Sequence, residues 1–166
     1  MVFSENNLVI KKLTMSILAL DPAGTSQTGY FYFANWSHYE IGSINGKNYL
    51  IQAKNLENLL KKLSPQILIW ETSYWWKSSQ AQKDLQELVY LNGVLGWLAD
   101  KHGCESQRIL NHSVKEVGNR QKIVGLEQAE NGWQFKGQVI NVHERDALIV
   151  FWIHWMRVLR KEWPFA

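Results

Sequence analysis

The sequence predicts an α/β protein in which a mixed, five-stranded β-sheet is flanked by α-helices. Two short runs contain only apolar residues, which is typical of strands buried on both faces at the centre of a sheet. Two longer segments carry apolar residues at helical spacing. Strand-like and helical segments alternate through most of the 166 residues, and this order places helices against a sheet.

The first part of the chain predicts a three-strand antiparallel meander. Ile17–Leu20 is wholly apolar and Tyr30–Phe33 is wholly aromatic. The turn residues between them are Pro22, Gly24 and Gly29. A third strand is expected at His38–Ile44, closed by the turn dipeptide Asn45-Gly46.

The middle of the chain predicts a helix, a strand and a second helix. Leucines share one face of Asn55–Leu63, and Pro65 ends this helix. The apolar run Ile67–Trp70 predicts a strand parallel to the first one. A long helix is expected from about Gln80 to His102, and Gly103 ends it.

The last third contains the least legible stretch. Ser106–Leu110 predicts the fifth strand, and Ser113 is expected to cap a short helix through Val117. Residues 118–142 show no long pattern because glycines interrupt them. A final helix is expected from near His143 to about Lys161.

Length and composition predict a single globular domain, with residues 1–15 as a loose N-terminal extension. One cysteine, Cys104, permits no internal disulfide. The N-terminus lacks a signal-peptide pattern, and the longest apolar run, Ala147–Ile153, is too short to cross a bilayer. We therefore expect a cytoplasmic protein without membrane association. The net charge of +3 is compatible with a polyanionic partner.

Both wholly apolar strands end on an acid, Asp21 and Glu71. Parallel neighbours end at the same edge of a sheet, so the two carboxylates are expected side by side, where ligands bind in open α/β sheets. His143 and Asp146 are three residues apart and share a face at the start of the last helix, whereas Arg145 is expected to point elsewhere.

Together these four side chains suit two hard cations, Mg²⁺ or Mn²⁺, spaced for in-line cleavage of a phosphodiester by water. Each has a simpler explanation when taken alone. An aspartate before proline commonly forms a turn, and a polar pair at a helix start commonly caps it. Their joint occurrence at matching places in the predicted fold favours the metal site.

The sequence resembles the RuvC family of Holliday junction resolvases, within the RNase H-like superfamily. The similar stretches are LALDPAGTSQTGYFYF, ILIWETSYW, SVKEVGNRQK and HERDAL, in the family's order across nearly the whole chain. Two features depart from the family pattern. The family's second lysine usually lies further from the first than Lys122 lies from Lys115. The stretch GLEQAENGWQFKGQV also does not have the pattern of the regular helix that is usual there.

The resemblance implies an RNase H-like fold and a homodimeric, Mg²⁺-dependent endonuclease that nicks four-way DNA junctions symmetrically. Branch-migration machinery is a further partner class. The implied metal ligands and catalytic residues are Asp21, Glu71, His143 and Asp146. The implied DNA-binding positions are Tyr74, as the aromatic that wedges into the junction, Lys115 near the scissile phosphate, and Lys122.

Two segments that carry aromatic residues each have two possible roles. Tyr74 is followed by two tryptophans and Lys77, so it either stacks on opened bases while Lys77 meets phosphate, or helps to fill the core. On the long helix, Tyr90, Val94 and Trp97 lie off the main apolar face. They are either buried within the monomer or form a dimer interface.

Other functions compete with junction cleavage. Another RNase H-like nuclease of phage or mobile-element type would use the same site on branched or flap DNA. A nucleotide phosphotransferase would need two such lobes, which this length does not supply. A catalytically silent junction-binding protein would be expected to lack a ligand, and all four are present.

Overall fold

The computed structural model describes residues 15–72 and 82–166, so the predicted N-terminal extension lies almost wholly outside the described residues. Its main sheet has five strands in the order β3-β2-β1-β4-β5. The strands are β1 Ile17–Asp21, β2 Ser26–Asn35, β3 His38–Gly46, β4 Ile67–Thr72 and β5 Glu105–Leu110. β1 pairs with β2 in antiparallel and with β4 in parallel orientation, and β5 is parallel to β4. This confirms the predicted mixed sheet.

The predicted turn at Asn45-Gly46 is wrong, because both residues belong to β3. Asn45 pairs with Gln27 and Gly46 with Ser26, so β3 stays paired as far as the first residue of β2. The chain then turns directly into α1 (Tyr49–Leu63), which begins earlier than predicted. Asn48 caps α1 by accepting a hydrogen bond from the Ile51 backbone.

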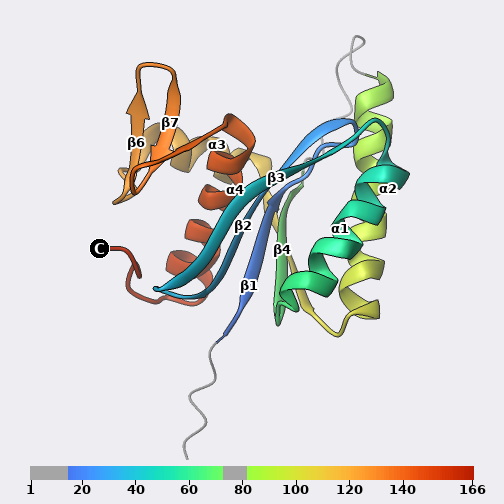
Figure 1. Ribbon diagram of the computed structural model, residues 1–166, viewed down its shortest axis with the longest axis horizontal. Coiled ribbons are helices and arrows are strands. Elements are labelled where there is room, and N and C mark those ends of the chain that lie inside the picture. The colour runs from blue at the N-terminus through green and yellow to red at the C-terminus, as the bar shows by residue number, and fades with distance from the viewer. Residues whose placement is uncertain (1–14, 73–81) are drawn as a thin grey trace, which may run out of the picture.

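Helices cover both faces of the sheet (Figure 1). On one face, α1 and α2 (Gln82–Lys101) pack leucines against Leu18, Leu20 and Trp70. On the other face, α4 (Val142–Ile153) packs against Ile17, Ala19 and the two phenylalanines of β2, Phe31 and Phe33. Alternate residues of β1 thus face opposite cores, which explains why its sequence is wholly apolar from Ile17 to Leu20.

The segment 118–142 forms a second, three-stranded antiparallel sheet. α3 spans Asn111–Arg120, longer than predicted, and Ser113 does not cap it because the helix begins two residues earlier. The strands that follow are β6 Leu126–Ala129, β7 Gly132–Phe135 and β8 Gln138–Ile140. Phe135 and Ile140 anchor this small sheet in the α4 core. Its short strands and glycine turns explain why no helical period was visible.

The final helix is shorter than predicted. α4 ends at Ile153 and continues as the π-helical turn η1 (His154–Val158), after which Arg160 adopts a positive φ and the chain folds back. Trp163 and Phe165 return to the same core. In the part of the chain that is described, no helix has the length and apolar character needed to cross a bilayer.

Candidate active site at the ends of β1, β4 and the start of α4

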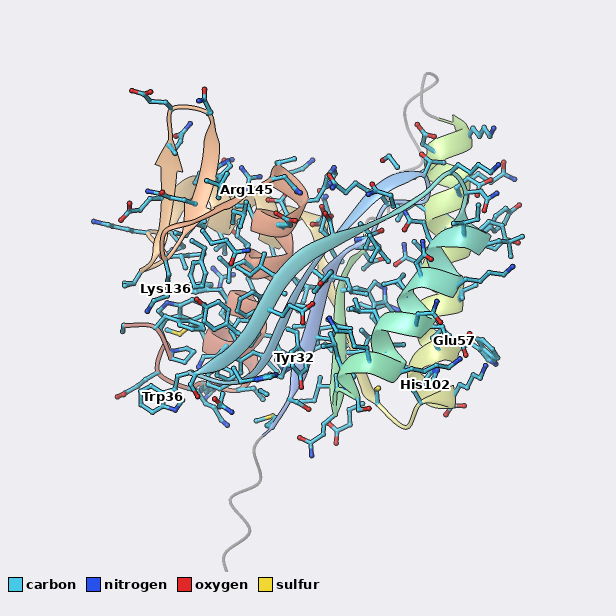
Figure 2. The ribbon with its side chains drawn as sticks, viewed as in Figure 1. Tyr32, Trp36, Glu57, His102, Lys136 and Arg145 are labelled. Carbon is cyan, nitrogen blue, oxygen red and sulfur yellow. The ribbon has the colours of Figure 1, made fainter. Side chains whose placement is uncertain are left out.

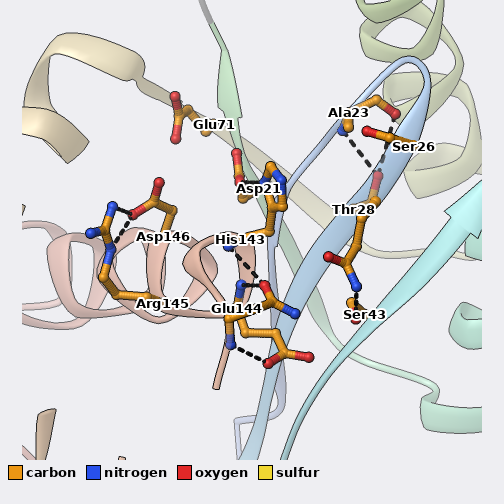
Figure 3. A network of polar contacts seen from close by, with 12 residues as sticks. Asp21, Ala23, Ser26, Thr28, Ser43, Glu71, His143, Glu144, Arg145 and Asp146 are labelled. Carbon is orange, nitrogen blue, oxygen red and sulfur yellow. Dashed lines mark hydrogen bonds and ion pairs between the residues drawn. The ribbon is translucent and has the colours of Figure 1, made fainter. Parts of the chain in front are cut away.

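The parallel pairing of β1 and β4 brings two acids to one edge of the sheet. Leu20 pairs with Trp70, so the residues that follow them, Asp21 and Glu71, lie side by side at this edge of the sheet. The first turn of α4 supplies His143 and Asp146 beside them (Figure 3). The structure thus places all four predicted site residues around one region.

A capping box fixes the start of α4. The Asn141 side chain accepts hydrogen bonds from the backbone N–H groups of His143 and Glu144, and the Glu144 carboxylate accepts one from the Asn141 backbone. Glu144 therefore has a capping role. Because the cap sets where the helix begins, it also determines that His143 and Asp146 lie in its first turn.

Each acid of the site is bound by a protein partner. Nδ1 of His143 lies 2.8 Å from Oδ2 of Asp21. The Asn111 amide, at the start of α3, donates a hydrogen bond to Glu71. Nε of Arg145 donates to Oδ1 of Asp146 at 2.7 Å. The expectation that Arg145 points elsewhere is wrong: its long side chain folds back onto its neighbour.

Burial and mutual repulsion raise proton affinity in the site. Burial, followed by the charge of Asp21, raises the pKa of Glu71 to about 7. Burial also raises the pKa of Asp146, although Arg145 opposes the shift. The hydrogen bond to Asp21 is the main cause that raises the pKa of His143. The positive charges around the cluster therefore do not fully compensate its negative charge.

The donor set fits a hard divalent cation. Carboxylate oxygens that repel one another are stabilised by a cation between them, and Mg²⁺ and Mn²⁺ prefer such ligands. Within residues 15–72 and 82–166, no three His, Cys, Asp or Glu side chains converge in this arrangement as a ready metal site. Asn111 and Arg145 bind two of the acids instead, so metal binding requires these side chains to rearrange.

A small pocket of about 80 Å³ adjoins the acids. Its lining includes Glu71, Asp146, Asn111, Lys115 and Arg145. The charge of Lys115 acts on Glu71 and lowers its pKa slightly, in opposition to the larger effect of burial. The structure thus brings the predicted Lys115 to the site.

Of the other three predicted DNA-binding residues, only Lys122 belongs to the part of the chain that the structure describes. Lys122 is exposed after the end of α3 and does not line it. Tyr74 and Lys77 lie outside the described residues.

Sequence reasoning missed Asn111, although the signal was present. Asn111 follows β5, the third parallel strand, just as Asp21 and Glu71 stand at the ends of their strands. Applying the strand-end argument to β5 would have identified it. Arg145 and its contact with Trp133 could not be found in this way, because they depend on the position of the small sheet.

Comparisons with known proteins identify the fold. No protein-family model matches the sequence, and no curated protein does. RuvC from Thermus thermophilus in complex with a Holliday junction substrate is 13% identical, with a TM-score of 0.63 over 88% of this chain and 96% of that chain. A second structure of Thermus thermophilus RuvC is 14% identical, with a TM-score of 0.61 and the same coverage, 88% and 96%.

The yeast mitochondrial Holliday junction resolvase is 16% identical over 91% of this chain and 72% of that chain, with a TM-score of 0.47. Both RuvC structures align along nearly their whole length with the mixed sheet and its flanking helices. The chain therefore has the RNase H-like fold of the RuvC Holliday junction resolvases.

Proposed function

We propose that this protein is a metal-dependent endonuclease that cleaves four-way DNA junctions. The observation that carries the proposal is that Asp21, Glu71 and Asp146 surround one region, at the carboxyl ends of β1 and β4 and the first turn of α4. Their location in a RuvC-like fold supports DNA as the substrate. The resolved RuvC complex contains a Holliday junction, which makes this branched DNA the first substrate to test.

Asp21, Glu71, His143 and Asp146 would hold two Mg²⁺ or Mn²⁺ ions. When bound, such ions activate a water and stabilise charge on the phosphate. The residues of the chain perform the positioning: His143 orients Asp21 by a 2.8 Å contact, and Asn111 orients Glu71. Lys115, exposed beside the pocket, is suited to bind a non-bridging phosphate oxygen.

A two-fold symmetric junction suits a homodimer, and α2 offers the surface for it. Val89, Tyr90 and Trp97 are exposed on this helix. Val94 instead packs against the core, so it is not part of the outward surface expected from its spacing. Tyr74, Lys77 and Lys122 remain proposed DNA contacts, with Tyr74 as the residue that wedges between base pairs. Branch-migration machinery remains a proposed partner, in the cytoplasm.

Cleavage of flap or otherwise branched DNA is a second candidate function. The same acids would perform it, and the small sheet β6–β8 favours it. This sheet stands where the resemblance predicts a regular helix. A different element beside the site can receive a different DNA arm.

Purified protein incubated with a synthetic four-way junction, a Y-flap and a linear duplex of matched sequence tests the proposal. We expect paired nicks in the junction with Mg²⁺ and none with EDTA. Asp21→Asn should abolish nicking and keep junction binding, because it removes an anionic ligand but little volume. Preferential cleavage of the flap would establish the second candidate instead. Absence of cleavage on all three substrates with either Mg²⁺ or Mn²⁺ would overturn both.

A further inference from the structure

Arg145 connects the candidate metal ligand Asp146 to the small sheet. Its Nε lies 2.7 Å and its Nη2 2.5 Å from Oδ1 of Asp146. On its other side, the guanidinium lies 4.8 Å from the centre of the Trp133 ring. Both charged side chains keep only 23% of their exposure. Figure 2 shows Arg145 at the start of α4 beside this sheet, far from Glu57 and His102.

This pairing between consecutive helix residues needs an external support. Successive side chains of a helix point about 100° apart, so neighbours do not normally face each other. Arg145 reaches Asp146 only by folding back, and Trp133 provides the surface against which it folds. Trp133 is itself fixed, because it packs on the core in which Phe135 and Ile140 anchor the small sheet. The small sheet β6–β8, which the sequence pattern did not predict, thus orders the Arg145 side chain that binds Asp146.

The contact competes with metal binding. Nε and Nη2 of Arg145 both contact Oδ1 of Asp146, so this oxygen is not available to a cation in this arrangement. Once released, a guanidinium binds a phosphate oxygen by the same charge-assisted hydrogen bonds that it makes to a carboxylate. Arg145 lines the same pocket as Lys115, so a phosphate there would meet both cations.

We propose that Arg145 is a positioning residue that exchanges partners: it holds Asp146 in the metal-free protein and transfers to a DNA backbone phosphate when a divalent cation binds. Trp133 keeps the guanidinium between the two partners throughout the exchange. This inference rests on the proposed nuclease function and extends it, since it adds a residue and a supporting sheet to the site.

Mn²⁺ binding to the DNA-free protein, measured by calorimetry at constant pH and salt, tests the first half. We expect Arg145→Gln to bind Mn²⁺ about tenfold more tightly, because one competing charge-assisted contact is lost. Trp133→Leu keeps every charge and should tighten binding about threefold by loosening the guanidinium. Arg157→Gln is the matched control, since Arg157 also stacks on a tryptophan, 6.0 Å from the Trp152 ring, and should leave the affinity unchanged.

Single-turnover junction cleavage at saturating Mn²⁺ tests the second half. Arg145→Gln should slow cleavage about tenfold despite its tighter metal binding, since a phosphate contact is absent. Arg145→Lys, which keeps the charge, should recover part of the rate. Unchanged or weaker Mn²⁺ binding by both Arg145→Gln and Trp133→Leu overturns the exchange, and so does an unchanged cleavage rate for Arg145→Gln. A wild-type protein that neither binds Mn²⁺ nor cleaves DNA overturns the proposed function, and the exchange with it.

Discussion

A β-carbon on Gly29 would lie 2.1 Å from the carbonyl oxygen of His143, so the first turn of α4 rests directly on the backbone of β2. Gly29 also pairs with Asp21 across β1 and β2. One glycine thus adjoins the backbone of two candidate metal ligands, Asp21 and His143, that are 122 positions apart in the chain. Any side chain there would push α4 away from the sheet.

Gly29→Ala is expected to damage both stability and cleavage. The clash is with backbone, which rotamer changes cannot relieve, so we expect a loss of about 2–3 kcal/mol in the free energy of unfolding. Cleavage should fall by a larger factor than the unfolded fraction explains, because His143 and Asp146 are displaced. Urea unfolding and junction cleavage measure the two effects.

Gly96→Ala is the matched control. Among the described residues beyond the backbone of α2 itself, the nearest atom to its β-carbon would be a side-chain nitrogen of Arg108 at 3.9 Å, and alanine favours the helix by about 1 kcal/mol. Equal behaviour of the two variants would mean that α4 adjusts freely and that Gly29 does not position the site.

His143→Asp is expected to keep junction cleavage and to change the metal preference. A nitrogen ligand suits Mn²⁺ better than Mg²⁺, whereas a carboxylate suits both. The ratio of Mg²⁺-supported to Mn²⁺-supported rates should therefore rise in the variant. His143→Ala, which supplies no ligand, should be nearly inactive with either ion. If His143→Asp is as inactive as His143→Ala, the histidine does not act as a ligand.

Glu71→Gln should stabilise the metal-free protein, increasingly so as the pH rises. The pKa of Glu71 is raised from 4.5 to about 7, so between these values the folded state keeps a proton that the unfolded chain has released. Wild-type stability therefore falls as pH rises through this window, by up to about 3 kcal/mol from this group. The glutamine variant has no such loss.

Urea unfolding in EDTA at pH 4.5 and at pH 8 measures the difference. We expect the variant to exceed the wild type by about 2–3 kcal/mol at pH 8 and by much less at pH 4.5. Saturating Mg²⁺ should stabilise the wild type and reduce the gap. Glu105→Gln, on the exposed start of β5, is the matched control for the loss of one carboxylate. A constant gap across the pH range would assign the effect to packing.

Trp97→Glu is expected to convert a dimer into monomers. Trp97 keeps 57% of its exposure on α2. A charge at this place in an apolar interface would weaken the association of the two subunits severalfold to many-fold. Trp36→Glu is the control, because Trp36 is 76% exposed on the turn between β2 and β3, away from α2 (Figure 2). Sedimentation at micromolar concentration distinguishes the species. A monomeric wild type would exclude this interface.

Much of the fold was predictable because local patterns and the final structure agree. The first four residues of β1 and of β4 are wholly apolar since both faces of these strands are covered, and this feature is visible in the sequence alone. The small sheet β6–β8 was not predictable, since its strands are three or four residues long and only Phe135, Ile140 and their neighbours bind it to the core. Strands this short carry no readable period.

The sequence by itself determined which chemistry the site can offer. Acids at the ends of two buried strands and a polar pair at a capped helix start are local facts, and parallel pairing follows from the apolar runs. Only the tertiary structure decided which side chains those groups bind. Asn111 binds Glu71, and Arg145 turns back onto Asp146 because Trp133, from a separate sheet, lies against it. Partner choice among charged side chains depends on distances of a few ångströms between segments far apart in the chain, and no spacing within the sequence records those distances.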